Sequence, residues 1–165
     1  IMRRSTTYPS VRFFRTTSLY RLIQRNRHHL TQIGDYTDIV GMERNQLERK
    51  LEKRDEQERI FGLFLGDEFI GTVSLIQYEA TVFGLGYWIG QRNAGKGYMT
   101  EAVRSVIGLA KDKFGATEIW AGIKPNNTAS IRLVRRLGFQ LAREQPVHQS
   151  YRLNVSTSDG EHQSK

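Results

Sequence analysis

The hydrophobic and polar positions of this chain change their period from segment to segment, and the period predicts the secondary structure. Short runs in which apolar and polar residues alternate, rich in Val, Ile and aromatic residues, are typical of strands. Apolar residues three and four positions apart are typical of helices that bury one face. The predicted strands are 11–15, 60–65, 69–76, 82–89, 117–123, 139–144 and 149–155, and the predicted helices are 19–30, 42–59, 99–114 and 127–137.

The predicted helices differ in the width of their apolar face. Helix 99–114 has a broad apolar face, which we expect to pack on the sheet. Met42, Leu47 and Leu51 give helix 42–59 only a narrow apolar stripe among many charged residues. We therefore expect this second helix to lie across the outside of the domain, as scaffold or as a rim for the substrate.

The chain is predicted to be one domain. Its 165 residues suffice for a single core, and no linker, repeat or change of composition divides them. The domain is expected to span 11–155, with a flexible basic N-terminus over 1–10 and a disordered tail over 156–165.

The start of the chain is rich in Arg, Ser and Thr and poor in acidic residues, as organelle transit peptides are. Only about ten residues precede the first predicted strand, which is too few for most such signals. No apolar run approaches the roughly 18 residues of a membrane span. We expect a cytoplasmic protein without membrane association, as a monomer or a homodimer.

The composition argues against thiol and metal chemistry. The chain contains no cysteine, so it has no disulfide and no thiol nucleophile. Its four histidines, at positions 28, 29, 148 and 162, show no metal-ligand spacing, and no metal is predicted. His28 and His29 are interpreted as solvated helix residues.

The formal net charge is +8, and the positive charge is concentrated near the start of the chain, because no acidic residue precedes Asp35. Such a region attracts RNA, ribosomes, acidic proteins or a polyanionic cofactor. A plain soluble basic surface is the other interpretation, since the aromatic and glycine pattern of an RNA-reading sheet is absent. The arginines concerned are Arg3, Arg4, Arg12, Arg15, Arg21, Arg25 and Arg27.

The most informative segment is 85–102, where an apolar strand runs through a glycine-rich basic loop directly into an amphipathic helix. Gly95 and Gly97 permit positive φ, so successive backbone N–H groups can converge on a phosphate. The helix that follows adds the positive end of its dipole. The segment predicts that the ligand is a phosphorylated cofactor.

Spacing separates three kinds of phosphate loop. From Gly90 the chain reads G-x-x-x-x-G-K, but Gly97 stands where a nucleotide-triphosphate loop needs Ser or Thr for Mg²⁺. Gly84, Gly86 and Gly90 resemble the glycine motif of dinucleotide-binding proteins, but the last interval is one residue too long. No acidic residue follows at the distance at which such proteins bind a ribose. The third pattern, Arg92-x-x-Gly95-x-Gly97, has no missing or extra residue. It resembles the coenzyme A pyrophosphate loop of the GNAT N-acetyltransferase superfamily.

A second segment agrees with this resemblance. Residues 117–123 read as a strand, 124–126 as a turn, and 127–137 as a helix capped by Asn127 and ended by a glycine. Ser130 shares a face of that helix with Val134 and its apolar neighbours, so its hydroxyl points inward and needs a partner. The chain contains four motifs in this order: Gly-Tyr-Trp-Ile, Gly-Lys-Gly-Tyr-Met-Thr-Glu-Ala, Asn-x-x-Ser and Leu-Gly-Phe. These motifs are similar to those of the ribosomal-protein N-terminal amino-acid acetyltransferases.

The resemblance, which spans roughly 11–155, implies an α+β fold with a single GNAT-like domain. It implies a mixed, mostly antiparallel sheet of about six to seven strands, with helices on both faces and central strands splayed apart. It also implies acetyl-coenzyme A as co-substrate and direct acetyl transfer to an amine, without a covalent enzyme intermediate. The implied cofactor-binding residues are Trp88, Ile89, Arg92, Asn93, Ala94, Gly95, Lys96, Gly97, Tyr98, Met99, Asn127 and Ser130.

The resemblance also suggests how the departing thiolate is stabilised. Many members use a tyrosine at the position where this chain has Val134, so that group is missing. The ribosomal-protein branch offers the serine of Asn-x-x-Ser, which makes Ser130 the candidate acid or thiolate hydrogen-bond donor. A hydroxyl that only positions the cofactor, and an Asn127 that only caps the helix, are the alternatives.

The base is harder to assign. Many relatives carry a glutamate two residues before Gly-Tyr-Trp, where this chain has Gly84. Glu79 is the candidate base, acting through water, ahead of Glu118 and Glu101; a solvated loop residue is the alternative for Glu79. An α-amino group with a pKa of about 7.7 to 8.0 needs little help from a base, which favours an N-terminal amine over a lysine.

The sequence therefore predicts an acetyl-coenzyme A dependent N-acetyltransferase that acts on a protein N-terminal α-amino group, with a ribosomal protein or the ribosome as a possible partner. A small amine, such as an amino acid, aminoglycoside or polyamine, is the alternative acceptor, and a basic rim of Arg21, Arg25 and Arg27 disfavours polycations. Two other classes stay open. One is an acyl-coenzyme A binding module with little catalysis, and the other is a basic RNA- or ribosome-associated protein.

Overall fold

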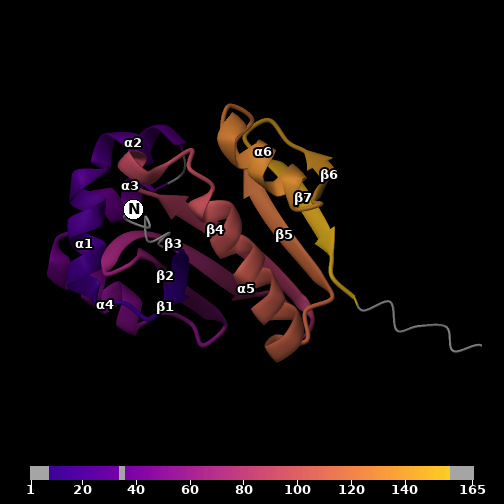
Figure 1. Cartoon of the computed structure of the whole chain (residues 1–165), viewed down its shortest axis with the longest axis horizontal. Coiled ribbons are helices and arrows are strands. Elements are labelled where there is room, and N and C mark those ends of the chain that lie inside the picture. Colours follow the sequence, from indigo (N-terminus) through magenta and orange to yellow (C-terminus); the bar gives the residue numbers. More distant parts are fainter. Residues whose placement is uncertain (1–7, 34–35, 157–165) are drawn as a thin grey trace, which may run out of the picture.

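The fold is known from a computed structural model, which describes residues 8–33 and 36–156 of the chain. Its centre is a seven-stranded sheet of order β1-β2-β3-β4-β5-β7-β6 (Figure 1). All neighbouring strands are antiparallel except β4 and β5, which are parallel. The predicted α+β class and mostly antiparallel sheet are confirmed. The strands are β1 (Pro9–Arg12), β2 (Glu58–Leu65), β3 (Glu68–Gln77), β4 (Val82–Ile89), β5 (Glu118–Ile123), β6 (Gln140–Glu144) and β7 (Gln149–Asn154).

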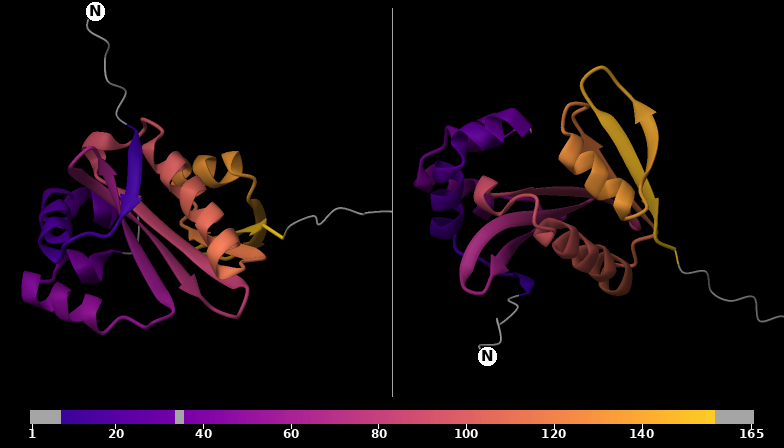
Figure 2. Two further views of the ribbon diagram at one scale, coloured as in Figure 1. Left: turned by 60° about the horizontal axis from the view of Figure 1, so that its bottom comes forward. Right: turned by 45° about the horizontal axis from the view of Figure 1, so that its top comes forward.

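Helices cover both faces of the sheet, as expected. The long helix α5 crosses one face and α6 lies on the same side over β5, whereas α1 to α4 gather on the opposite face near β3 and β4 (Figures 1 and 2). No helix in the described part of the chain combines the length and the apolar character needed to cross a membrane. The helices are α1 (Thr16–Arg25), α2 (Arg27–Ile33), α3 (Thr37–Val40), α4 (Arg44–Glu52), the 3₁₀ turn η1 (Gln91–Asn93), α5 (Tyr98–Phe114) and α6 (Thr128–Arg136).

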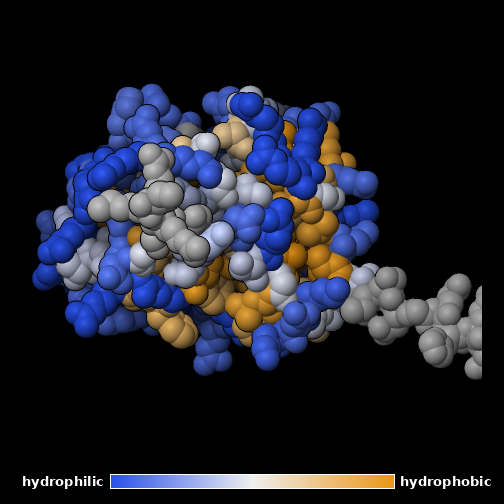
Figure 3. Space-filling model, viewed as in Figure 1, coloured by the Kyte–Doolittle hydropathy of each residue, from blue (hydrophilic) through white to orange (hydrophobic). Residues whose placement is uncertain are grey.

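Two hydrophobic cores lie on opposite faces of the sheet. The larger core joins the sheet to α5 and α6 and includes the fully buried Phe83 and Val103. The smaller core joins the sheet to α1 and α4 and includes Trp88 and Leu47. Because side chains alternate along a strand, Tyr87 faces the larger core while Trp88 faces the smaller one. In the space-filling view, apolar side chains form a band beside α5, whereas the surface over α1 to α4 is mostly hydrophilic (Figure 3).

The single helix predicted over 19–30 is wrong, because the chain breaks at Asn26 into α1 and α2. The Asn26 side-chain amide donates to the Leu22 carbonyl at 2.8 Å, and its oxygen accepts from the Gln91 N–H at 2.9 Å. Asparagine side chains compete with the backbone for hydrogen bonds and so favour helix ends over helix interiors. The Gln91 partner is 65 residues away, so the break depends on a tertiary contact that periodicity does not register.

The helix predicted over 42–59 is also too long, since α4 ends at Glu52 and β2 begins at Glu58. A capping box between Glu43 and Gln46 sets its start. Glu58 pairs with Ile76 of β3, so strand pairing takes residues that the charge pattern assigned to a helix. The short α3 lies in a segment that was predicted as loop. The narrow apolar stripe is confirmed, because Leu47 is buried while most of α4 is exposed.

The domain is predicted to begin at residue 11 and to end at residue 155. Strand β1 begins at Pro9, two residues before its predicted start. Residues 1–7, which include the basic arginines Arg3 and Arg4, lie outside the described residues, as do residues 157–165 of the tail predicted over 156–165.

The two central strands separate, as predicted. Strand β4 pairs with β5 only from Val82 with Glu118 to Gly84 with Trp120. Beyond that point residues 85–89 stay with β3, while residues 121–123 stay with β7. The sheet therefore divides into two diverging halves, visible in the right-hand view of Figure 2.

Candidate functional site

The gap between β4 and β5 opens into a cavity of about 630 Å³. Tyr87 and Ser130 line it from the side of α5 and α6, and His29 and Tyr36 line it from the side of α2 and α3. A cavity lined from both faces of a sheet can hold two ligands that meet in the gap between the strands.

One end of the cavity is the loop between β4 and α5. Gly95 and Gly97 have φ values of 73° and 84°, in the region that L side chains avoid, and neither would place a Cβ within 4 Å of another atom. Gly97 is the N-cap of α5, and no side chain caps this helix end. The first N–H groups of α5 have no partner inside the helix, and they carry the positive end of a 17-residue helix dipole. This end of the cavity is therefore suited to bind an anion, as the glycine spacing predicted.

Neighbouring elements hold this loop in place. The Gly90 N–H donates to the Ile70 carbonyl at 2.8 Å, and the Gln91 N–H donates to the Asn26 side chain. Asn93 is buried, and its N–H donates to the Gly90 carbonyl at 3.0 Å. A Cβ on Gly90 would lie 3.2 Å from the Asn26 amide nitrogen, so the loop packs closely against the end of α1. The loop is thus built before any ligand arrives.

The predicted cofactor residues are brought together here. All of them line the cavity except Arg92 and Lys96, which are exposed on the same loop. Those that line it are Trp88, Ile89, Asn93, Ala94, Gly95, Gly97, Tyr98, Met99, Asn127 and Ser130.

The edge of β4 presents backbone groups to the gap. The Gly90 N–H bonds to β3, and because partners alternate along an antiparallel ladder, the backbone groups of Leu85, Tyr87 and Ile89 point the other way. Strand β5 has already left at these positions. The Tyr36 hydroxyl donates to the Tyr87 carbonyl at 3.1 Å, and His29 hydrogen-bonds the Ile89 backbone. The N–H groups of the three strand residues therefore face the cavity.

The element around Ser130 closes the other wall. The Asn127 side chain caps α6 by accepting from the Ser130 N–H at 3.2 Å. The Tyr87 hydroxyl donates to the Ser130 carbonyl at 3.4 Å, which joins β4 to α6 across the gap. Burial raises the pKa of Tyr87 to about 12, and a hydrogen bond with the Ser130 side chain acts in the opposite direction. Val134 is fully buried and Ser130 borders the cavity, so the predicted inward face of this helix is confirmed.

None of the three candidate glutamates lines the cavity. Glu79 is exposed in the turn before β4, at the end of that strand away from the loop, because β4 runs from Val82 toward Gly90. This placement gives no support to Glu79 as the base. Glu118 accepts a hydrogen bond from the Trp120 indole at the start of β5.

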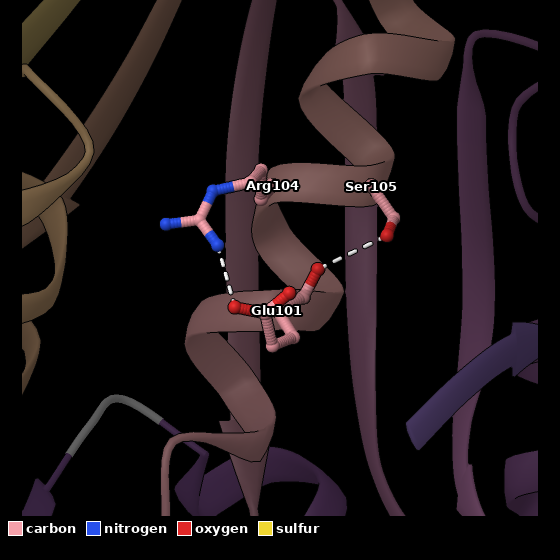
Figure 4. A network of polar contacts seen from close by, with 3 residues as sticks. All are labelled: Glu101, Arg104 and Ser105. Carbon is pink, nitrogen blue, oxygen red and sulfur yellow. Dashed lines mark hydrogen bonds and ion pairs between the residues drawn. The ribbon is translucent and has the colours of Figure 1, made fainter. Parts of the chain in front are cut away.

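Glu101 has partners within α5. Its carboxylate forms an ion pair with Arg104 at 2.5 Å, and its carbonyl accepts from the Ser105 hydroxyl at 3.0 Å (Figure 4). Figure 4 shows both contacts running along the helix from Glu101 toward its next turn. Glu101 is therefore occupied on the exposed side of α5.

Several cavity residues were not anticipated from the sequence. His29 was interpreted as solvated, which is wrong, because it borders the cavity, whereas His28 is exposed. Tyr36 lies in a segment with no readable pattern, and His148 lies in the turn between β6 and β7. The Gly-Tyr-Trp motif was the only sequence signal near Tyr87. The helix break at Asn26 and the pairing of β7 with β5 bring these residues together, and neither is encoded locally.

The charged residues of the cavity are basic. Lys124, Arg132 and Arg136 line it, and no Asp or Glu of the described residues does so. Arg132 and Arg136 are one helical turn apart on α6, a spacing that could have been read from the sequence. A cavity with this charge favours a polyanionic ligand.

Acidification is expected to destabilise the fold through His29. Burial lowers the pKa of His29, while the hydrogen bond with the Ile89 backbone raises it to a smaller extent. The unfolded chain, with a histidine pKa of about 6.5, then binds the proton more readily than the folded one. The stability contributed by neutral His29 is thus present above about pH 6.5 and lost as the pH falls through the lower folded pKa.

Urea unfolding at pH 7.5 and pH 5.5 measures this effect. The His29→Gln variant should show a smaller loss of unfolding free energy between the two pH values than the unchanged protein. His28→Gln is the matched control, because His28 is exposed and its ring hydrogen-bonds the Gln32 side chain, one turn along the same helix, at 3.0 Å. An unchanged pH dependence in His29→Gln would contradict the assignment.

Comparison with known families agrees with the geometry. Residues 16–140 match the family described as Acetyltransferase (GNAT) domain. The probable N-acetyltransferase YjcK of Bacillus subtilis (strain 168) is 36% identical over 116 residues, which cover 67% of this chain and 64% of YjcK. The match thus spans slightly less than two thirds of the length of that relative.

Solved structures share the fold. RimL, a ribosomal α-N-protein acetyltransferase solved with coenzyme A, superposes with a TM-score of 0.80 at 17% identity, over 91% of this chain and 96% of RimL. The spermidine N-acetyltransferase of Vibrio cholerae superposes with a TM-score of 0.73 at 15% identity, over 90% of this chain and 95% of that enzyme. At such identities the likeness concerns the fold, and these two proteins act on different kinds of amine.

Proposed function

This chain belongs to the GNAT acetyltransferase family, and we propose that it transfers an acetyl group from acetyl-coenzyme A to a primary amine. The observation that carries this proposal is the cavity between β4 and β5, which begins at the glycine loop and ends where the two strands separate. Such a cavity fits a ligand with a diphosphate at one end and a reactive thioester at the other.

The cofactor is proposed to bind along β4. Its diphosphate would accept hydrogen bonds from the amides of 95–99, and Lys124, Arg132 and Arg136 would balance the remaining phosphate charge. The pantetheine arm would run beside the N–H groups of 85–89, a stretch of about 13 Å at about 3.3 Å per residue. The thioester would then lie in the gap beside this stretch, between β4 and α6.

The reaction is proposed to be a direct transfer. The amine nitrogen attacks the thioester carbonyl carbon from the side of α2 and α3, the C–N bond forms, and the C–S bond breaks with its electron pair on sulfur. The backbone N–H groups facing the gap would stabilise the negative charge on the carbonyl oxygen. Ser130 would donate a hydrogen bond to the departing thiolate, as the sequence predicted, and the amine proton leaves to solvent.

Calorimetry and turnover test the proposal. Coenzyme A should release or absorb heat on binding to the protein, and acetyl-coenzyme A should be consumed in the presence of an amine. Binding without turnover would favour the acyl-coenzyme A binding module, and stabilisation by RNA without a response to coenzyme A would favour the nucleic-acid alternative. No response to coenzyme A would contradict the proposal.

The proposed acceptor is a protein N-terminal α-amino group, as in the ribosomal-protein branch. The absence of a carboxylate among the described lining residues supports this choice, because the neutral form of the amine must then come from solution and not from a base in the cavity. An α-amino group with a pKa of about 7.7 to 8.0 is roughly 10–15% neutral at pH 7, whereas a lysine with a pKa of about 10.4 is less than about 0.1% neutral. The basic lining supports an acidic or neutral acceptor over a polyamine.

An acceptor panel tests this choice. At pH 7.5 the neutral fraction of an α-amino group exceeds that of a lysine roughly 250-fold, so we expect a comparable ratio of initial rates. The panel compares an acidic peptide with a free N-terminus, the same peptide blocked at the N-terminus and carrying one lysine, and spermine. Mass spectrometry with labelled acetyl donor reads the products. Robust acetylation of spermine would overturn the acceptor assignment and leave the cofactor assignment intact.

A further inference from the structure

We propose that the phenol of Tyr87 donates the hydrogen bond that stabilises the departing thiolate of coenzyme A, with Ser130 as its partner. This inference rests on the proposed acetyl transfer and adds a catalytic residue to it. The Tyr87 hydroxyl reaches across the gap from β4 to the wall of the cavity formed by α6, where it contacts Ser130.

Tyr87 lies beside the proposed path of the cofactor. It lies three residues beyond Gly84, the last residue of β4 that pairs with β5, so about 10 Å of strand separates it from the closing point of the gap. Its side chain leaves β4 on the side of α5 and α6, which is the side that carries the glycine loop at the start of α5. A cofactor that extends from that loop along β4 into the gap meets this side chain before the closing point.

The hydroxyls of Tyr36 and Tyr87 differ in how firmly their protons are held by hydrogen bonds. The Tyr36 hydroxyl donates to the Tyr87 carbonyl at 3.1 Å, so its proton is committed to the backbone of β4. The Tyr87 hydroxyl donates to the Ser130 carbonyl at 3.4 Å, near the limit of a hydrogen bond. An anionic sulfur accepts more strongly than a neutral carbonyl at that distance, so the arrival of a thiolate would redirect the Tyr87 proton.

The protonation state of Tyr87 suits this task. Burial raises its pKa to about 12, so the phenol is protonated throughout the range in which proteins work. An ordinary thiol has a pKa of about 8.5, well below that value. The phenol therefore keeps its proton and acts through a hydrogen bond, while the sulfur leaves as a thiolate and takes its proton afterwards from solvent.

The role of Tyr87 can be tested directly through the thiol of coenzyme A, because the chain contains no cysteine. The thiol of bound coenzyme A is then the only thiol in the sample. Its pKa in the complex can be followed by the ultraviolet absorbance of the thiolate during a pH titration. A donor to the thiolate lowers this pKa, whereas a residue that only shapes the cavity does not.

The variant to test is Tyr87→Phe, which keeps the ring in the larger core and removes only the hydroxyl. We expect the pKa of the bound thiol to rise by about one unit, which corresponds to a tenfold weaker stabilisation of the thiolate. The kcat should fall about tenfold, with the KM for acetyl-coenzyme A within about twofold of the original value. Thermal unfolding checks that the variant is folded.

Two further variants keep the result interpretable. Tyr20→Phe removes a phenol from α1, outside the cavity lining, and should change neither the bound thiol pKa nor kcat. Ser130→Ala combined with Tyr87→Phe should give effects that are not additive, because the two hydroxyls act on one sulfur. The other charged and titratable groups that line the cavity are unchanged in every variant, namely His29, Tyr36, Tyr98, Lys124, Arg132, Arg136 and His148.

The outcomes separate this inference from the proposed function. A bound thiol pKa that is the same in Tyr87→Phe and the unchanged protein would overturn the role of Tyr87, even if acetyl transfer proceeds. Failure of the unchanged protein to bind coenzyme A would overturn the proposed function itself. A raised thiol pKa together with a lower kcat and an unaltered KM would support Tyr87 as the donor.

Discussion

Replacing Gly97 with valine is expected to weaken the binding of coenzyme A by at least about 100-fold, or roughly 2.7 kcal/mol of binding free energy. Gly97 has a φ of 84°, which is a genuine outlier for a β-branched residue. The space beside it is open, because an added Cβ has no atom within 4 Å, and a valine side chain would extend into the space proposed for the diphosphate. The same change turns the amides at the start of α5 away from their present direction.

The matched control is Gly115→Val at the other end of α5. Gly115 also has a positive φ, 65°, and also faces open space. Its replacement should cost about 1–3 kcal/mol of strain, as at Gly97, but it lies far along the helix from the anion site. Titration calorimetry compares coenzyme A binding by the two variants, and thermal unfolding compares their stabilities.

A difference in binding between the two variants is the informative result, because the strain is shared and the anion site is not. If Gly97→Val binds coenzyme A as tightly as Gly115→Val, the amides of this loop do not hold the diphosphate. The cofactor assignment would then need another site.

The second large effect is expected on stability. Trp88→Ala should lower the free energy of unfolding by about 3–5 kcal/mol, as large-to-small changes of buried aromatic residues do. The Trp88 side chain is 5% exposed and packs with Tyr36, whose ring centroid lies 6.3 Å away. It belongs to the smaller core, which attaches α1 and α4 to the sheet. Its loss should therefore loosen the helices that cover this face.

Urea unfolding measures the effect of Trp88→Ala. Phe13→Ala is a suitable control, because Phe13 is an aromatic residue that is 87% exposed and its removal should change the free energy by less than about 0.5 kcal/mol. Trp88→Phe should recover much of the lost stability, since it refills part of the cavity left behind.

The same variants separate two roles of Trp88, that of a core residue and that of a cofactor contact. Trp88 borders the cavity, as expected for a cofactor contact, and its side chain also belongs to the smaller core. A large loss of stability indicates that the ring acts mainly as a core residue. A stability change below about 1 kcal/mol together with much weaker coenzyme A binding would instead support a direct contact.

The conformations of the glycine loop and of the start of α6 could be predicted well because their signals are local. Gly95 and Gly97 stand where the backbone needs positive φ, and Asn127 stands where α6 needs a cap, so the residue type follows directly from the backbone conformation. The face that turns Ser130 inward follows from helical spacing. These features depend on a few consecutive residues, and they were readable without knowing what packs against them.

The residues around the reacting centre could not be predicted in this way. Glu79 follows β3 and precedes β4, so its distance from the gap depends on the direction of a strand and on where β5 leaves it. His29 reaches the cavity because Asn26 ends α1 by bonding to Gln91, which is 65 residues away. Tyr87 meets Ser130 only because β4 and α6 face each other across the open gap.

The sequence by itself thus determined the type and order of most elements, the conformation of the glycine loop and the capped helix, and the family. The tertiary structure decided which helix ended early, which residues of α4 were given over to β2, and which side chains from distant segments share the cavity. The physical reason is that backbone dihedral preferences and amphipathic periods act over a few residues. Strand pairing and core packing act between residues that are far apart along the chain, and they override the local preference where the two conflict.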